Sequence, residues 1–422
     1  MVCVMRTGLA LGLVLAVAGC GEGATTPDGA MPGGGQAPVA GASASGTSGS
    51  SAAGTSGGSV GSVQAGGNGN GSGSGGAGGG SGSGASGSSG HGGGAGAGGG
   101  ASGGAGGSGG GMVGPQNVVF SQCRVHFGTI DSKAKSNAGM IQELDFFTPA
   151  WMGQQDTFDQ KYVCDEGKEG AVLGKQVPVI VAYVSAFYVK RHHGQLCDCN
   201  VTTCGQTNGK PNDLCNFGAQ YIQQDLAAIT EVYKSYAQGY AGCYGTKRPI
   251  VFEMEPDFYQ YTGSTQGMPM TKAQAGMILD QYVTTMKQYL PNAYFSIDIS
   301  PWVDDNGLTN GQDWYSHFDL SKFTFVNTSG GNTLGADTKI RSDNMMTWAG
   351  VSQVTGKGVL ADTGYGANGA SAGHDASWDD VNNLNARSAD GVLSISQYNP
   401  KADWGTTIAS IRGQLKPPKF CP

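Results

Sequence analysis

The chain has 422 residues, of which 76 are glycine, and a formal net charge of −7 at pH 7. Acidic residues outnumber lysine and arginine by 31 to 24 and no basic block occurs, so we expect no nucleic-acid partner. Most glycines fall within the first 115 residues, so the rest of the chain is more apolar than the overall 38% indicates.

Residues 1–19 have the pattern of a secretory signal: Arg6, an apolar stretch over 9–17, and small residues at the end. The apolar stretch is too short to span a bilayer. The sequence Val17-Ala18-Gly19-Cys20 resembles the lipobox of bacterial lipoproteins. That resemblance implies cleavage before Cys20, lipidation of its thiol and an anchor in the bacterial cell envelope, at the outer membrane or cell surface. A plain signal peptide with an incidental cysteine is the alternative.

Residues 20–115 consist almost entirely of glycine, serine and alanine. Such a segment buries too little apolar surface to offset its conformational entropy, so we expect a disordered linker. The remainder, 116–422, is long enough for one large folded domain. We therefore expect a signal, a disordered linker and one domain, in that order.

Eight cysteines remain in the expected folded domain after Cys3 and Cys20 are set aside. An even number in an exported domain predicts disulfides, although the sequence leaves their pairing open. Four of them lie within nineteen residues, and their C-x-C-x4-C-x10-C spacing does not match a common zinc site. The eight are Cys123, Cys164, Cys197, Cys199, Cys204, Cys215, Cys243 and Cys421.

Short apolar runs recur along the domain and predict strands. Between several of them, helical periodicity covers 216–238, and a second helix is expected to begin after Thr271 as its N-cap. Alternation of buried strands with helices predicts a parallel sheet, as in an α/β, TIM-like, distorted (β/α) barrel. An open doubly wound sheet is the alternative. The predicted strands are 117–120, 177–184, 250–254, 294–299, 323–327, 358–362 and 391–397.

Nucleotide binding is disfavoured, because no Gly-x-Gly-x-x-Gly sequence follows a strand in this domain, and nothing demands a cofactor. The run Lys190-Arg191-His192-His193 is expected to be a solvated basic loop rather than a metal site.

Carboxylates gather at 253–257. Strand alternation predicts that Glu253, Glu255 and Asp257 share one face, pointing into the barrel near the ends of its strands. Crowded carboxylates cannot all ionise, and a raised pKa suits a general acid. A structural acid paired with lysine or arginine, and a calcium site, are the alternatives.

Other predicted strands also end in acids or amides, with aromatic residues nearby. Carboxylates beside aromatic faces are typical of carbohydrate sites, because the rings stack on sugars while the acids bind hydroxyls or transfer protons. The expected substrate-binding residues are Asp298, Trp302, Asn327, Asp362, Trp378 and Trp404.

Four segments between Tyr221 and Asp362 together resemble family-six glycoside hydrolases, the inverting cellobiohydrolases and endoglucanases. They are Glu255-Pro256-Asp257, Leu290-Pro291-Asn292-Ala293 with Asp298 after it, Phe325-Val326-Asn327 with Asn332 downstream, and Asp362-Thr363-Gly364 with Asn368-Gly369 after it.

The resemblance implies a monomeric glycoside hydrolase that cleaves a β-1,4-glucan-like polysaccharide by single displacement. Carried over, it makes Asp213 the proton donor, Asp257 its modulating neighbour and Asp403 the candidate for activating water, with Glu255 beside them. The chain lacks the family's Pro-Asp-Arg-Asp segment and the Lys and Glu before its last acid.

Two other functions stay open. The first is a non-catalytic glycan-binding lipoprotein, in which tryptophans stack on sugars and the acids only accept hydrogen bonds. The second is a structural or adhesion domain without a small-carbohydrate site. The tryptophans of the first alternative are Trp302, Trp314, Trp378 and Trp404.

Overall fold

The computed structural model describes most of the expected folded domain. The signal, Cys20, the linker, Trp302 and Asn332 lie outside the described residues. The described residues are 119–120, 122–130, 142–148, 151–160, 176–194, 196–199, 201, 203–263, 269–300, 303, 308–328, 333, 335–340, 346–364 and 373–420.

The main sheet is a closed ring of parallel strands. β1 pairs with both β11 and β2, and β2 pairs with β4, which closes the circle. β2 and β3 both pair with β4 and together occupy one strand position of the ring. The ring therefore has eight strand positions, and the predicted barrel is confirmed. The strands are β1 (His126–Thr129), β2 (Phe146–Phe147), β3 (Trp151–Met152), β4 (Val177–Ala182), β7 (Ile250–Met254), β8 (Ala293–Asp298), β9 (Phe325–Thr328), β10 (Gly358–Thr363) and β11 (Val392–Gln397).

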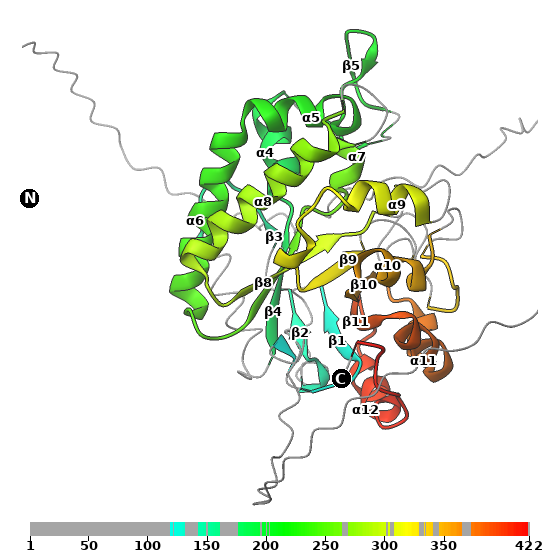
Figure 1. The fold of residues 1–422 in the computed structure, drawn as a ribbon. Helices are drawn as coiled ribbons and strands as arrows, with labels where there is room; N and C mark the ends of the chain where they lie inside the picture. The colour runs from blue at the N-terminus through cyan, green and yellow to red at the C-terminus, as the bar shows by residue number, and fades with distance from the viewer. Residues whose placement is uncertain are drawn as a thin grey trace, which may run out of the picture.

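Helices surround the strands, with α6 and α8 on one side and α10, α11 and α12 on the other (Figure 1). The helices are α4 (Val184–His192), α5 (Leu214–Gln224), α6 (Leu226–Tyr244), α7 (Phe258–Thr262), α8 (Lys272–Tyr289), α9 (Leu308–Tyr315), α10 (Trp348–Thr355), α11 (Val381–Asp390) and α12 (Trp404–Arg412), with 3-10 turns η4 (Leu320–Lys322) and η5 (Ala376–Asp379).

Six of the seven predicted strands form, and the run at 117–120 is the exception. Its described residues, Val119 and Phe120, are not in a strand, and β1 begins only at His126. Phe120 stacks on His126 and also contacts Phe325 at the start of β9, so it fills the amino-terminal end of the barrel. Val119 and Phe120 are apolar because they cover the amino-terminal end of the barrel.

The helical stretch at 216–238 differs from the expectation of one helix. It divides at Asp225, whose φ of −105° and ψ of 14° end α5 and precede α6. The expected cap of the next helix is confirmed. The Thr271 side chain accepts a hydrogen bond from the Gln274 backbone N–H, and the Gln274 side-chain oxygen accepts one from the Thr271 backbone N–H.

Disulfides hold the loop between α4 and α5. Cys197 pairs with Cys204 and Cys199 with Cys215, around the hairpin β5 (Gln206–Thr207) and β6 (Lys210–Pro211). Cys123 and Cys243 are disulfide-bonded as well. These bonds confirm the disulfide prediction and indicate an exported protein. In the described part of the chain, no helix combines the length and apolarity needed to cross a membrane.

The capping box gives a stability prediction. Thr271→Ala should lower the free energy of unfolding by ~1 kcal/mol, because the first turn of α8 loses a hydrogen-bond acceptor. Thermal or denaturant unfolding measures the change. Thr284→Ala is the control, since Thr284 is exposed within the same helix. An equal loss in both variants would contradict the prediction.

Candidate active site

The carboxyl-terminal half of the barrel interior is polar. The strand register pairs Glu253 with Ser296, and Asp298 with Asn327. Paired residues of parallel strands point to the same face, so these side chains line one interior surface. The Ser296 hydroxyl donates to Asn327 Oδ1 at 2.6 Å. The amino-terminal half is filled instead by apolar side chains.

Glu253 lies deepest in this polar layer. It is 1% exposed, and neither carboxyl oxygen has a hydrogen-bond partner among the described residues. No described lysine or arginine pairs with it, so the described contacts do not support the structural ion pair considered as an alternative. Burial raises the pKa of Glu253 well above its usual range, and the nearby charges of Asp362 and Asp298 raise it further.

Asp362, on β10, is the partner acid. It is 4% exposed, and its Oδ1 accepts a hydrogen bond from the Ser396 hydroxyl at 2.8 Å. Burial raises the pKa of Asp362 to about 7, against the opposing effect of that hydrogen bond. The charges of Glu253 and Asp362 repel, so loss of one proton makes loss of the second harder. At neutral pH this interior therefore holds a carboxylic acid that can donate a proton.

Glu255 corrects the expectation that three acids share one face. β7 ends at Met254, and Glu255 has a φ of 47°, which breaks the alternation. Its carboxylate turns into the helix layer, where it accepts from the Ser185 N–H at 2.8 Å and from the hydroxyls of Tyr233 and Tyr261. These contacts give Glu255 a structural role, because it holds groups of the helix layer together. Its catalytic role stays a prediction.

Asp257 lies at the mouth of the barrel. It also has a positive φ, 63°, and its N–H donates to Asp298 Oδ2 at 3.0 Å. Its own Oδ1 accepts from the Gln260 amide at 3.1 Å. Strained non-glycine residues cluster at functional sites. Asp257 and Asp298, predicted separately as a catalytic and a substrate-binding residue, lie together where β7 and β8 end.

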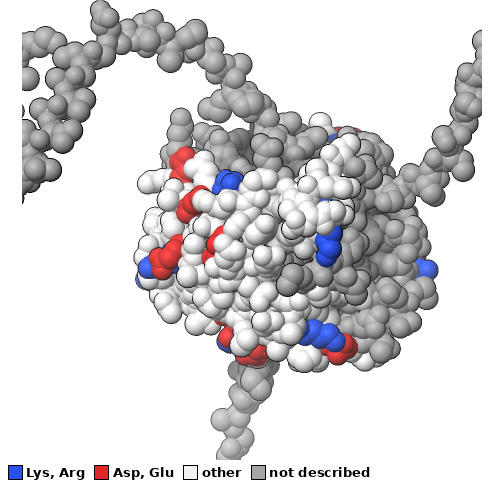
Figure 2. Space-filling model, turned by 90° about the horizontal axis from the view of Figure 1, so that it is seen from above, with Lys and Arg blue, Asp and Glu red and all other residues white. Residues whose placement is uncertain are grey.

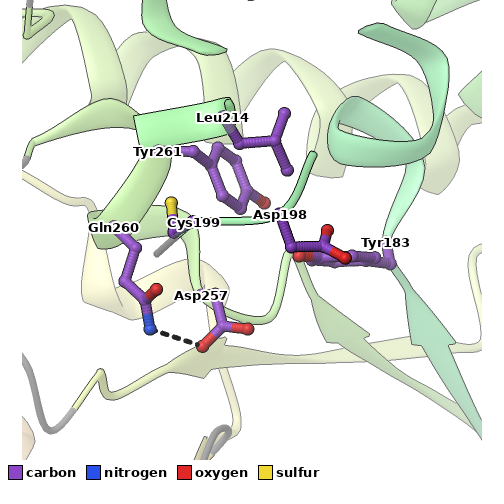
Figure 3. A pocket seen from close by; sticks show the side chains of 7 residues that line it. All are labelled: Tyr183, Asp198, Cys199, Leu214, Asp257, Gln260 and Tyr261. Atoms are coloured by element: carbon purple, nitrogen blue, oxygen red, sulfur yellow. Dashed lines mark hydrogen bonds between the residues drawn. The ribbon is translucent and has the colours of Figure 1, made fainter. Parts of the chain in front are cut away.

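A small pocket of about 20 Å³ opens beside Asp257 (Figure 3). Its walls come from the residue after β4, from α7 and from the disulfide-bonded loop. Tyr183 stays protonated, because burial first and the charges of Asp257 and Asp198 next raise its pKa well above the ordinary value. The lining residues are Tyr183, Asp198, Cys199, Leu214, Asp257, Gln260 and Tyr261.

The two other predicted catalytic acids both precede helices. Asp213 is 2% exposed, and its Oδ1 accepts hydrogen bonds from the backbone and side-chain amides of Asn216. Asp213 is thereby the N-cap of α5. Asp403 is exposed and precedes α12 without a side-chain cap bond. In the ring order β7 and β11 lie opposite one another, so Asp403 follows the strand across the barrel from Asp257. Their catalytic roles stay predictions.

The predicted tryptophan platforms differ from the expectation. Trp378 and Trp404 are 0% and 1% exposed, and their indole N–H groups donate to Thr333 O and Asp379 Oδ1. Trp314 is also buried. Rings packed on both sides present no face to a sugar, so these side chains belong to the core.

A different aromatic group borders the mouth. Trp151, in β3, lies edge-on to Tyr183 and to Tyr398, which follows β11. Trp151 and Tyr398 are partly exposed. Sequence reasoning missed Trp151 because a two-residue strand has no periodic signal.

The basic run at 190–193 is not a solvated loop. Lys190, Arg191 and His192 form the last turn of α4, and each is paired with an aspartate. Among the described residues, no three His, Cys, Asp or Glu side chains are arranged to hold a metal ion. On the described part of the face in Figure 2, acidic and basic side chains are scattered. The expectation of no nucleic-acid partner stays a prediction.

No protein-family model matches the chain, and no curated protein matches it in sequence. The family-six resemblance therefore stays a prediction.

Solved structures share the barrel at low similarity. A GH26 β-mannanase from Bacteroides ovatus is 10% identical, covering 72% of this chain and 92% of its own, with a TM-score of 0.45. GH26C from a Muricauda species is 14% identical over 73% and 90%, with a TM-score of 0.42. The carboxyl transferase domain of Rhizobium etli pyruvate carboxylase is 10% identical over 72% and 47%, with a TM-score of 0.39. Such distant and chemically varied barrels carry no argument about activity.

The raised pKa of Asp362 predicts how stability depends on pH. A carboxyl whose pKa is about 7 when folded and 3.8 otherwise destabilises the fold increasingly as the pH rises between these values. Asp362→Asn cannot ionise, so it should gain stability relative to the natural protein, by up to ~4 kcal/mol, between pH 4 and pH 8. Denaturant unfolding of both proteins at pH 4 and at pH 8 measures the difference in their free energies of unfolding. The same difference at both pH values would contradict the assignment of Asp362 as a buried acid.

The contacts of Glu255 predict a structural loss. Glu255→Gln replaces one carboxylate oxygen, which accepts hydrogen bonds, with an amide NH₂, which donates them. The groups that face it, two tyrosine hydroxyls and the Ser185 N–H, also donate. The variant should therefore lose ~2 kcal/mol of folding free energy. Glu231→Gln, at an exposed position, is the control. Equal stability of the two variants, measured by denaturant unfolding, would argue against this role.

Proposed function

We propose that the protein is an exported polysaccharide hydrolase, a glycoside hydrolase that works at the carboxyl-terminal mouth of its barrel. The observation that carries the proposal is the coupled pair Glu253 and Asp362, buried inside that mouth with raised pKa values. Active sites of β/α barrels lie at this end. Raised carboxyl pKa values in such a position are typical of acid–base catalysis.

In this proposal Asp362 is the general acid. With a pKa of about 7 it keeps its proton near neutral pH and can pass it to the leaving glycosidic oxygen. The base is a second carboxylate at the mouth, for which Asp257, Asp298 and the earlier candidate Asp403 compete. Single displacement requires that this base hold a water on the opposite face of the sugar. Asp213 is a weaker donor candidate, since its carboxylate caps a helix.

The substrate in this proposal is a β-1,4-glucan-like chain, bound along the mouth by a monomer and needing no cofactor. Trp151 and Tyr398 supply partly exposed ring faces there, and ring faces stack on pyranoses. The placement at the cell envelope, by a lipid on Cys20 and a Gly/Ser tether, is part of the same proposal.

A glycan-binding lipoprotein without turnover is the second candidate. The observation in its favour is that two of the four catalytic acids predicted from the sequence accept structural hydrogen bonds, Glu255 at both carboxyl oxygens and Asp213 at Oδ1. Binding without hydrolysis on any polysaccharide would decide for it.

Activity measurements test the hydrolase. The folded domain should release reducing sugar from at least one β-linked polysaccharide in a broad panel. Asp362→Asn should lower kcat at least ~100-fold, because the leaving group loses its proton donor. The rate should also fall as the pH rises through about 7, where Asp362 loses its proton.

The exposed variant Glu231→Gln is the activity control. Retained turnover in Asp362→Asn, with loss in Asp213→Asn instead, would transfer the acid role to Asp213. No product from any substrate would reject the hydrolase proposal.

A further inference from the structure

Asp198 carries a carboxylate oxygen whose partner is missing from the described residues. The residue is 8% exposed; its Oδ1 accepts from Lys190 Nζ at 2.8 Å, whereas its Oδ2 is buried without a described hydrogen-bond partner. A buried acceptor left unpaired costs free energy. Since Asp198 lines the pocket, a ligand donor entering the pocket would satisfy that oxygen.

The backbone around Asp198 is held in place. Its two neighbours, Cys197 and Cys199, belong to different disulfides, to Cys204 and Cys215. A charge fixed in this way does not have to be ordered when a ligand binds, which favours affinity. The disulfides thus act on the pocket directly, and Cys199 itself forms part of its wall.

The charged side chains that line the pocket are carboxylates. Asp198 and Asp257 both line it, and Asp298 accepts the Asp257 N–H just behind the wall. Lys190 offsets part of this charge through Asp198 Oδ1. Tyr183 and Tyr261 add ring surface to the lining of the pocket (Figure 3), and the charge of Asp198 contributes to the raised pKa of Tyr183.

An ammonium group fits this arrangement better than a hydroxyl or a metal ion. It has three donors and one positive charge, which suit two carboxylates, and it gains from aromatic rings nearby. A sugar hydroxyl can donate to a carboxylate but brings no positive charge to it. No metal-holding group of three or more ligands occurs among the described residues.

We propose that this pocket binds the protonated amino group of a sugar, so that the substrate is a polysaccharide with free amino groups, of the de-N-acetylated hexosamine class. The inference rests on the proposed function, since it places an amine-recognising subsite beside the proposed catalytic mouth. The volume of the pocket, about 20 Å³, suits one group of about the size of a water molecule, such as an ammonium group, so the sugar ring that carries it would lie outside the pocket.

Three hexasaccharides with the same β-1,4 backbone test the proposal: glucosamine, N-acetylglucosamine and glucose oligomers, which differ at one substituent. Calorimetric titration, at a pH that keeps the amines charged, should show the glucosamine oligomer binding at least about tenfold more tightly than the other two. Asp198→Asn should remove that preference and leave binding of the glucose oligomer unchanged.

Two further variants separate recognition from folding. Lys190→Gln removes the cation that competes for Asp198, so it should strengthen amine binding, whereas damage to the fold would weaken it. Glu231→Gln, at an exposed position, should change nothing. Weaker binding of the glucosamine oligomer in Lys190→Gln would overturn the proposal.

The remaining outcomes distinguish this inference from the hydrolase proposal. Equal affinity for the three oligomers, with hydrolysis retained, would reject the amine subsite alone. Failure to bind any of them would reject the amine subsite, and failure to release product from the whole polysaccharide panel as well would reject both. Displacement of the oligomer by a blocked lysine as readily as by glucosamine would reject the assignment to an amino sugar. Amine-dependent binding that persists in Asp362→Asn, with turnover lost, would support both.

Discussion

The central constraint on this structure is the burial of two carboxyl groups, Glu253 and Asp362, inside a closed ring of strands. Burying an ionised carboxylate costs several kcal/mol, and such groups respond by keeping their protons. The cost is confined to the carboxyl-terminal half of the barrel. The opposite half is filled by apolar side chains and closed by Phe120, and a larger apolar layer surrounds the ring. Stability from these regions sustains a polar interior at the mouth.

The exit of β7 distributes three neighbouring acids over three environments. Glu253 is still in the strand and points into the barrel. At Glu255 the backbone enters the left-handed region, and its carboxylate enters the helix layer, where Tyr233 and Tyr261 bond it. Asp257, left-handed again, returns to the mouth. Because Glu255 and Asp257 both have positive φ, the strand alternation ends there and leaves one interior acid, one structural acid and one acid at the mouth.

The sequence predicted the ring because strand and helix periodicities are local properties of the chain. It also predicted Asp298 and Asp362 at strand ends, for the same reason. It misplaced Glu255 because a positive φ at a glutamate has no signal in composition, and it took Trp378 and Trp404 for platforms because burial of a ring depends on distant partners. Asp198 went unnoticed, although its position between two cysteines was visible.

Asp298 connects the interior acids with the pocket. Its Oδ2 accepts the Asp257 N–H at the pocket wall, and its charge contributes to the raised pKa of Glu253 inside the barrel. A cation bound beside Asp257 would offset part of the negative potential that the interior carboxyls experience, and this favours their ionised forms. Binding in the pocket and proton occupancy in the barrel would then be linked, because both depend on the same group of aspartates. An amine-bearing substrate would therefore arrive together with a change in the proton affinity of the acids that act on it.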